Sequence, residues 1–455
     1  MSQTQLLTPP LPAGAPGAMP WYRAIALFRR NALQVWAPEA YEQPIETRRL
    51  LGRTRLLINS PGAIRHVLID NTANYRRSPA TYRILGPIVG RGLFLSEGED
   101  WKHQRRTLAP AFAPRTLPLL ARHVAAATDE AVLRLQREAG RPTHLFAAIQ
   151  HLALEIAGRS MFSLEMRDRG PELRALLVRY GERLGRPYLL DMLLPRGVPS
   201  PHDLARWWFR PQWRRLMERL IGERRQAPAA DAPRDLLDLL AAARDPESGA
   251  AFSASQLRDQ VATMLVAGHE TTAVALFWSL YLLALAPAEQ DKVAAEVAGL
   301  DLGPEGAAEA LPHLVHSRAV VSEGVRLYPP AFTMVRVAIG TDELDGVAVA
   351  PGSLIMISPW VLHRHRRLWR DPEAFDPSRF LPGAPAIDRF AYLPFGVGPR
   401  VCIGAQFALT EATLVLARLV QAFRITVERT PPVLPVGVIT TQPDHSPLFT
   451  LNPRR

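Results

Sequence analysis

Apolar residues recur with the three-to-four-residue spacing of helices over the middle of the chain, from Trp101 to about residue 300. The longest such stretch runs from Ser253 to Pro287, where a serine can cap the first turn and the proline ends the last. At about 1.5 Å per residue this helix would be about 45–50 Å long, enough to cross a domain. Loops that contain proline or glycine separate the predicted helices at residues 139–142, 195–201 and 226–233.

Short runs of apolar and β-branched residues near both ends of the chain predict strands. Two runs flank Gly52 as a hairpin, and Ser60-Pro61 then opens a short helix that reaches about Ile69. A last helix and a second hairpin close the chain. The pattern predicts a mainly α protein with small β-sheets (α+β). The predicted strands are residues 45–51, 53–58, 335–339, 347–349 and 353–358, with turns at Asp345-Gly346 and Pro351-Gly352.

The chain length of 455 residues exceeds the usual size of one domain, so it forms either two domains or one large helical body that buries a cofactor. We expect a flexible Pro/Gly-rich N-terminus over residues 1–20 and a single domain over 21–455. Residues 1–20 lack the basic start and long apolar run of a signal peptide or membrane anchor. The apolar run at 273–286 is too short to span a membrane and predicts a buried helix.

One cysteine excludes a disulfide framework and any zinc or iron–sulfur site built from several cysteines of this chain. It favours a reducing, cytoplasmic location. The formal charge of +11 comes from arginines spread along the chain, without a basic helix interleaved with aromatic residues, so we expect no nucleic-acid partner. Two interpretations of the charge stay open: an ordinary solvated surface, or a basic face that steers an acidic electron carrier.

Cys402 lies in a glycine-rich loop that leads into an amphipathic helix. A lone cysteine is ordinarily a small buried apolar residue, but three neighbouring glycines would allow the backbone to approach a flat ligand closely. Arg400 could pair with an acidic group on that ligand. The loop resembles the haem-binding signature Phe-Gly-x-Gly-x-Arg-x-Cys-x-Gly of the cytochrome P450 family at all six defined positions. It reads Phe395-Gly396-Val397-Gly398-Pro399-Arg400-Val401-Cys402-Ile403-Gly404.

The resemblance implies a triangular helical body enclosing haem b, a minor β-rich region, and Cys402 as the metal ligand. Phe395, Arg400 and Gly404 would surround the cofactor. Trp101 and Arg105 match the family's Trp-x-x-x-Arg helix, and Arg336 follows the Pro329-Pro330 turn where the family commonly places an arginine. By the resemblance, Trp101, Arg105, Arg336 and Arg400 would bind the haem propionates, because arginine pairs with carboxylate through two hydrogen bonds.

The long predicted helix contains Ala267-Gly268-His269-Glu270-Thr271-Thr272, and an acid in an apolar helix is costly. Glu270 is therefore either paired structurally or used to relay protons. A glycine in mid-helix leaves room for a small ligand. The segment is similar to the family's distal pattern, so Ala267 and Gly268 would line the haem, Thr271 would hydrogen-bond dioxygen there, and Glu270 would help to supply protons.

Glu323 and Arg326 are three residues apart on one predicted helix face, a spacing that by itself indicates an ordinary surface ion pair. Arg379 follows in Phe375-Asp376-Pro377-Ser378-Arg379-Phe380. In the P450 family, a Glu-x-x-Arg pair and a later arginine form a buried triad that fixes the coil leading to the cysteine loop. If the triad is buried, losing one member would cost several kcal/mol.

The resemblance implies a monooxygenase that activates dioxygen and hydroxylates or epoxidises a hydrophobic fatty acid, terpenoid or aromatic compound. Electrons would come from NAD(P)H through a separate ferredoxin or flavodoxin with its reductase, and we expect a monomer. Arg83 and Arg91 could recognise a carboxylate, which keeps fatty acids open. Candidate pocket residues, in part from a loop predicted at residues 77–95, are Ile84, Leu85, Phe94, Leu193, Val266, Phe332, Met334, Val335 and Ile439.

Three other functions remain as alternatives. A peroxygenase would use hydrogen peroxide directly, and a thiolate-haem isomerase or dehydratase would need no dioxygen; the Glu270-Thr271 pair argues against both. A non-enzymatic haem sensor or electron carrier would need neither an apolar pocket nor Thr271.

Overall fold

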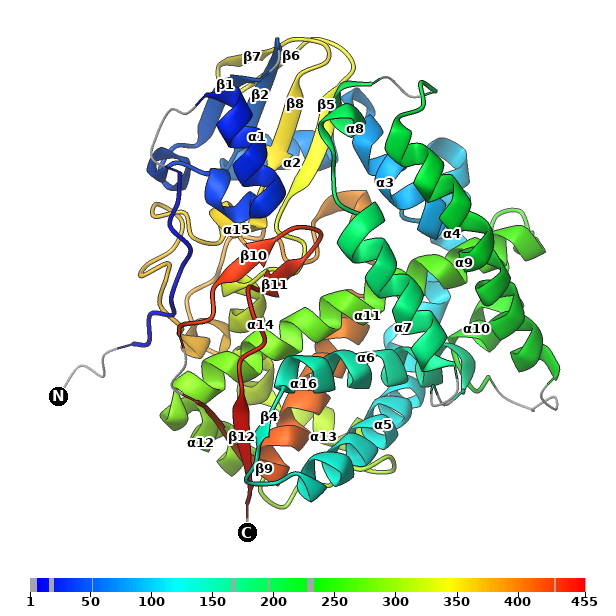
Figure 1. Ribbon diagram of the computed structural model, residues 1–455, viewed down its shortest axis with the longest axis vertical. Helices are drawn as coiled ribbons and strands as arrows, with labels where there is room; N and C mark the ends of the chain where they lie inside the picture. The colour runs from blue at the N-terminus through cyan, green and yellow to red at the C-terminus, as the bar shows by residue number, and fades with distance from the viewer. Residues whose placement is uncertain are drawn as a thin grey trace.

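The computed structural model describes residues 6–15, 20–50, 52–164, 166, 169–194, 197–226, 233–428 and 431–454. Helices fill most of the molecule, and a β-rich region formed by strands from residues 45–77 and 334–357 lies at one end (Figure 1). The helices are α1 (Trp21–Arg30), α2 (Pro61–Arg65), α3 (Pro79–Val89), α4 (Gly98–Leu108), α5 (Leu117–Arg137), α6 (Leu145–Phe162), α7 (Gly170–Arg179), α8 (Leu189–Leu193), α9 (Pro201–Gln226), α10 (Leu236–Ala242), α11 (Ala254–Leu285), α12 (Pro287–Glu296), α13 (Ala307–Ala310), α14 (Val315–Leu327), α15 (Pro359–Leu362) and α16 (Ala405–Ala422).

The strands form small sheets, of which the five-stranded one has the order β1-β2-β8-β5-β3. A second sheet has the order β4-β12-β9, and β6-β7 and β10-β11 are two-stranded hairpins. Thus strands from the first eighty residues pair with strands that follow residue 330. The strands are β1 (Ile45–Leu50), β2 (Arg53–Ile58), β3 (Tyr75–Arg77), β4 (Pro142–Thr143), β5 (Met334–Ala338), β6 (Asp342–Leu344), β7 (Val347–Val349), β8 (Leu354–Ile357), β9 (Phe423–Val427), β10 (Pro435–Gly437), β11 (Thr441–Pro443) and β12 (Phe449–Pro453).

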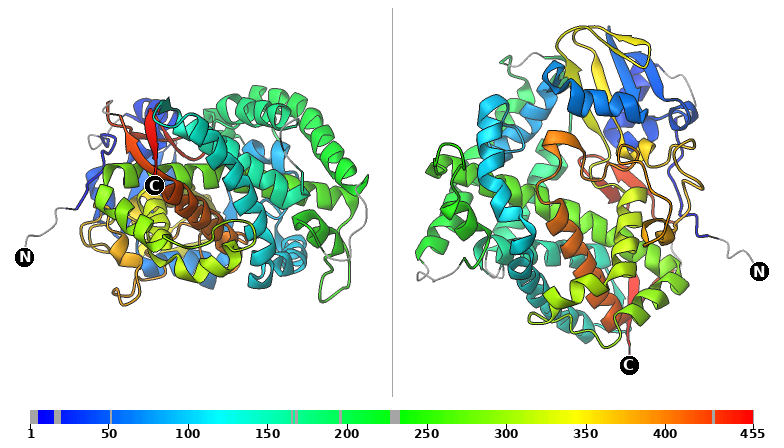
Figure 2. Two further views of the ribbon diagram at one scale, coloured as in Figure 1. Left: turned by 90° about the horizontal axis from the view of Figure 1, so that it is seen from below. Right: turned by 180° about the vertical axis from the view of Figure 1, so that it is seen from behind.

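Helix α11 confirms the long helix predicted from Ser253 to Pro287. The Ser253 side chain accepts a hydrogen bond from the Gln256 backbone N–H, and the Gln256 side chain accepts one from the Ser253 backbone N–H. At the other end, Pro287 starts the next helix. The C-terminal half of α11 is buried, and the helix packs against α6, α14 and α16. The helix is long and apolar enough to cross a membrane, but most of its apolar stretch is buried inside the protein. It is therefore the central core helix, and Figure 2 shows α16 packed beside it.

Residues 77–95 were predicted as a loop, and this prediction is wrong, because α3 occupies residues 79–89. Ser78 caps the helix by accepting from the Thr81 backbone, and Pro79 takes the first position, where its missing N–H costs nothing. These start signals outweigh the helix-breaking Gly86-Pro87 pair.

Part of the segment expected to be flexible lies against the body of the protein. Leu7 forms an isolated β-bridge with Phe375, whose backbone N–H donates to the Leu7 carbonyl at 2.8 Å. Leu7 and Leu11 also pack against the main apolar core. Within residues 6–15, apolar side chains thus contribute to the folded body.

Candidate active site

The loop before α16 turns sharply, with positive φ angles at Gly396 (69°) and Gly398 (78°). A side chain at Gly398 would come within 2.5 Å of the Leu68 carbonyl, so this position admits glycine alone. The Cys402 backbone N–H donates to the Phe395 carbonyl at 2.9 Å and closes the loop. This geometry explains the glycines of the loop, because its backbone lies directly against the turn after α2.

Cys402 has an accessible side chain although protein atoms surround it densely. Burial raises the pKa of its thiol, whereas the Gly404 N–H and the charge of Arg105 act in the opposite direction. Arg105 also donates to the Val401 carbonyl at 2.9 Å, which ties α4 to the cysteine loop. The sulfur is therefore accessible at a densely surrounded position and is not packed as an ordinary core residue.

Three arginines gather beside this loop. Strand pairing places Arg77 of β3 directly opposite Arg336 of β5, and Arg400 comes from the loop itself. Burial, followed by the charge of Arg77, lowers the pKa of both Arg336 and Arg400 to about 10. Burial also lowers the pKa of Arg77, whose nearest recorded anion, Glu97, is 3.9 Å away. Three half-buried cations with one distant carboxylate form a site that favours anions.

The remaining predicted residues of this region contact the cluster. The guanidinium of Arg400 lies 4.5 Å from the centre of the Trp101 ring and donates to the Ser96 carbonyl at 3.0 Å. Arg336 donates to the Val335 carbonyl at 3.0 Å. The structure thus brings Trp101, Arg336 and Arg400 together, while Arg105 lies closer to the cysteine.

Midway along α11, Ala267 and Gly268 are exposed, although the helix on either side is largely buried. A methyl group added to Gly268 would meet nothing within 4 Å. The Thr271 hydroxyl donates to the Ala267 carbonyl at 2.5 Å. This stretch therefore borders an open internal space on one side.

Glu270 is paired with the C-terminal hairpin. Its Oε1 accepts from the Thr440 hydroxyl at 2.9 Å and also from the Gln442 side-chain amide. Both partners are neutral. The neighbouring His269 is enclosed: its ring nitrogen lies 3.2 Å from the Gln150 carbonyl, and burial lowers its pKa to about 4.

Glu323 and Arg326 form a fully buried bidentate ion pair, with N–O distances of 2.6 and 2.8 Å. Arg326 also donates to the carbonyls of His363, Pro372 and Ala374, at 2.6–2.9 Å. Arg379 lies 3.5 Å from the Glu323 carboxylate. The three predicted residues therefore meet and hold the coil that precedes the cysteine loop.

Comparison with known proteins agrees with this geometry. The family model described as "Cytochrome P450" matches residues 10–447. The chain belongs to the cytochrome P450 family. It is 32% identical over 416 residues to a cyclooctat-9-en-7-ol 5-monooxygenase of Streptomyces melanosporofaciens, covering 90% of this chain and 89% of the relative. It is 30% identical over 435 residues to a pentalenene oxygenase of Streptomyces avermitilis, covering 94% of each.

The fold matches as well. The crystal structure of the cytochrome P450DA haem domain superposes with a TM-score of 0.78 and 25% sequence identity, covering 99% of this chain and 98% of that one. The predicted fold class is therefore confirmed, and the protein is a cytochrome P450 monooxygenase. Haem is the cofactor that the family implies.

The residues present fit haem. A flat apolar ring matches the exposed Ala267 and Gly268 on α11, and the accessible Cys402 sulfur offers a thiolate ligand. Two carboxylates would supply the negative charge that Arg77, Arg336 and Arg400 lack. Together these residues would suit the apolar ring, the iron and the carboxylates of haem.

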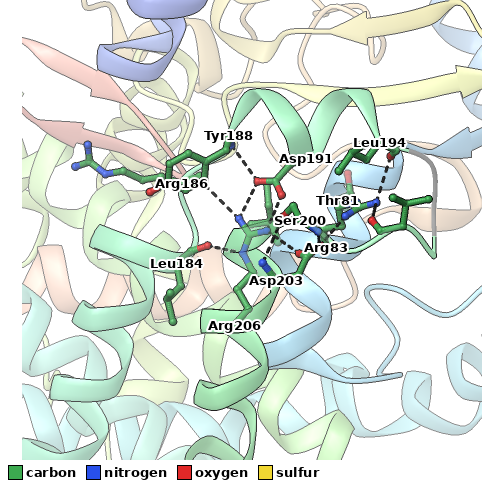
Figure 3. A network of polar contacts seen from close by, with 12 residues as sticks. Thr81, Arg83, Leu184, Arg186, Tyr188, Asp191, Leu194, Ser200, Asp203 and Arg206 are labelled. Carbon is green, nitrogen blue, oxygen red and sulfur yellow. Dashed lines mark hydrogen bonds and ion pairs between the residues drawn. The ribbon is translucent and has the colours of Figure 1, made fainter.

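Arg83 is not available to recognise a substrate carboxylate, contrary to the sequence-based hypothesis. Its side chain is 8% exposed and pairs with Asp203 at 2.6 Å, and it also donates to the Leu194 and Val198 carbonyls. Figure 3 shows this arginine in one network with Arg206, which forms a buried bidentate pair with Asp191 at 2.7 and 2.8 Å. The network binds α3, α8 and α9 together, so Arg83 has a structural role there.

The predicted pocket residues occupy different environments. Ile84, Leu85, Val266, Met334, Val335 and Ile439 are half-buried, Phe94 is exposed under the Arg77 guanidinium, and Phe332 is buried in the main core. Leu193 lies in α8, but its side chain falls outside the described residues. Arg91 is exposed and bonds Asp259 through its backbone N–H.

Sequence reasoning missed Arg77, Thr440 and Gln442. Arg77 follows Tyr75-Arg76 and precedes the Ser78-Pro79 helix start, a pattern that places it at a strand end but does not place it opposite Arg336. Thr440 lies in the stretch predicted as the terminal hairpin, but its partner on α11 is 170 residues away. Strand register and a contact at such a separation leave no local pattern in the sequence.

Proposed function

We propose that this P450 monooxygenase hydroxylates or epoxidises a hydrophobic compound, with terpenoids as the favoured class, and that Cys402 is the axial ligand of its haem. The observation that carries the proposal is the accessible Cys402 sulfur at the start of α16, next to a cluster of three arginines. Two relatives bear the names cyclooctat-9-en-7-ol 5-monooxygenase and pentalenene oxygenase, which supports a terpenoid substrate.

Haem ligated by a thiolate supplies the electron push that favours cleavage of the O–O bond. In this proposal the protein's own residues do the rest. Arg77, Trp101, Arg336 and Arg400 hold the propionates, Phe395 and Gly404 enclose the sulfur, and Ala267 and Gly268 leave space above the ring. Thr271 presents a hydroxyl fixed to the Ala267 carbonyl, and Glu270 supplies protons to that space.

Separate proteins deliver the electrons in this proposal. NAD(P)H would reduce a reductase, which passes electrons to a ferredoxin or flavodoxin that docks near Cys402. The net charge of +11 supports an acidic carrier, because opposite charges speed association. We further propose a cytoplasmic monomer, with residues 21–455 as one domain.

The test of the ligand is the difference spectrum of the reduced, haem-loaded protein with and without carbon monoxide. We expect a strongly red-shifted Soret band that is lost in Cys402→Ser. A wild-type band at the position typical of histidine ligation would overturn the proposal. Spin-state titration with pentalenene, and with a saturated fatty acid for comparison, then tests the substrate class.

A further inference from the structure

The tip of the hairpin β10–β11 reaches the middle of α11, where Glu270 lies. Thr440 ends the turn and Gln442 lies in β11, and both side chains donate to Glu270 Oε1. Thr441, between them, points the other way and donates to the Pro329 carbonyl at 2.6 Å. The hairpin lies near the centre of Figure 1, with its turn directed to the interior.

The two donors use only one oxygen of the carboxylate. Among the residues that the structure describes, none is recorded as donating to Oε2. Both donors are neutral, so no ion pair has to break when a proton arrives at Oε2 or leaves it. An acid anchored at one oxygen and free at the other is suited to pass protons while its position stays constant.

The two strands of the hairpin are also held by contacts that do not involve Glu270. The Trp278 indole donates to the Thr441 carbonyl at 2.7 Å, and the Asn31 side chain bonds Pro435 and Gly437 at 2.9 Å each. Removing the contacts of Thr440 or Gln442 would therefore free the acid without detaching the hairpin. The chain thus offers both test residues and a matched control on the same strand.

We infer that Thr440 and Gln442 are positioning residues for Glu270: they fix its Oε1 on the hairpin and leave Oε2 to hand protons to the space beside Thr271. The inference rests on the proposed proton-supplying role of Glu270. It also links proton supply to the substrate region, because Ile439 precedes Thr440 at the hairpin tip. A methyl group on Gly185 would come within 2.6 Å of the Ile439 side chain, so the tip abuts the segment that follows α7.

The first test needs no turnover. Infrared difference spectra of the haem-loaded resting protein, with Glu270→Gln as the reference, isolate the carboxylate bands of Glu270. We expect these bands to shift in Thr440→Val and in Gln442→Leu, because a hydrogen bond to the carboxylate is lost. They should stay in place in Thr440→Ser, which keeps the hydroxyl, and in Thr441→Val. Unshifted bands in both Thr440→Val and Gln442→Leu would overturn the inference.

The second test follows proton delivery without any organic substrate. Ferredoxin and its reductase supply electrons, and one measures the rate of oxygen consumption and its solvent deuterium isotope effect. We expect Thr440→Val to lower the rate about three- to tenfold, the range for losing one typical intramolecular hydrogen bond. Thr440→Ser should restore the rate, and Thr441→Val should leave it unchanged.

A double-mutant cycle separates positioning from a general structural effect. Thr440→Val should add nothing in a Glu270→Gln background. Equal, additive losses in both backgrounds would overturn the inference while leaving the role of Glu270 intact. If Glu270→Gln itself leaves the rate and the isotope effect unchanged, the proposed proton supply fails, and the inference fails with it. The carbon monoxide spectrum of each variant reports separately whether the haem site is folded.

Discussion

Glu323 on α14 and Glu270 on α11 are both carboxylates held by several donors, but their partners differ in charge. Glu323 is fully buried and paired with Arg326, so its charge is compensated permanently. Glu270 is half-buried and held by the neutral side chains of Thr440 and Gln442. Glu323 thus holds the chain through an ion pair, whereas the neutral partners of Glu270 suit the proton exchange that we propose for it.

The largest expected effect concerns the buried ion pair of Glu323 with Arg326. Glu323→Gln would leave Arg326 as a buried cation without its counter-charge. We expect the free energy of unfolding to fall by about 3–5 kcal/mol, with loss of haem, because the carbonyls that Arg326 organises belong to the coil before the cysteine loop. Urea unfolding and the haem-to-protein absorbance ratio measure both effects. A loss below about 1 kcal/mol would show that the pair does not hold the coil.

Glu411 on α16 is a third carboxylate to compare with Glu323 and Glu270. Burial raises its pKa to about 8 from 4.5. Below pH 4.5 both the folded and the unfolded chain carry the proton, so this contribution to stability is fully present. As the pH rises toward 8, the unfolded chain releases the proton first, and stability falls by about 5 kcal/mol in total. Urea unfolding across this range should show the decline in wild type and a flatter profile in Glu411→Gln. Identical profiles would contradict the raised pKa.

Arg77→Ala tests the cluster at the haem edge. Losing one charge-assisted hydrogen bond to a propionate should speed haem transfer to an apo-globin acceptor about tenfold. Arg76→Ala is the control, because Arg76 is exposed on the other face of β3. Equal transfer rates in Arg77→Ala and Arg76→Ala would remove Arg77 from the propionate site.

The smallest expected effect on stability concerns Thr271, which follows Glu270 on α11. Thr271→Ala should change the free energy of unfolding by less than about 1 kcal/mol, because the one partner recorded for its hydroxyl among the described residues is the backbone of its own helix. The same substitution should divert electrons from product to hydrogen peroxide once a substrate is identified. Stopped assays of NAD(P)H, peroxide and product give the ratio. Full coupling in Thr271→Ala would refute the relay assignment.

Local patterns predicted the elements of this protein well where start and stop residues are strong. Ser253 and Pro287 bound α11, and Gly52 sits in the turn of the first hairpin with a φ of 76°. The prediction failed at residues 77–95, where Gly86-Pro87 indicates a loop but a capped helix forms. There the packing of α3 against α9 and α11 supplies stability that intrinsic propensity does not express.

The sequence by itself determined the residues that chemistry requires within one loop or one helix turn: Cys402 with its glycines, Glu270 with Thr271, and Glu323 with Arg326. Tertiary structure alone decided which charges are paired. In the folded protein Arg77 lies opposite Arg336, and Arg83 is paired within a structural network. Folding also brings neutral donors to Glu270. The physical reason is that ligand spacing is local, whereas the electrostatic state of a side chain depends on what folding brings beside it and on how far water is excluded.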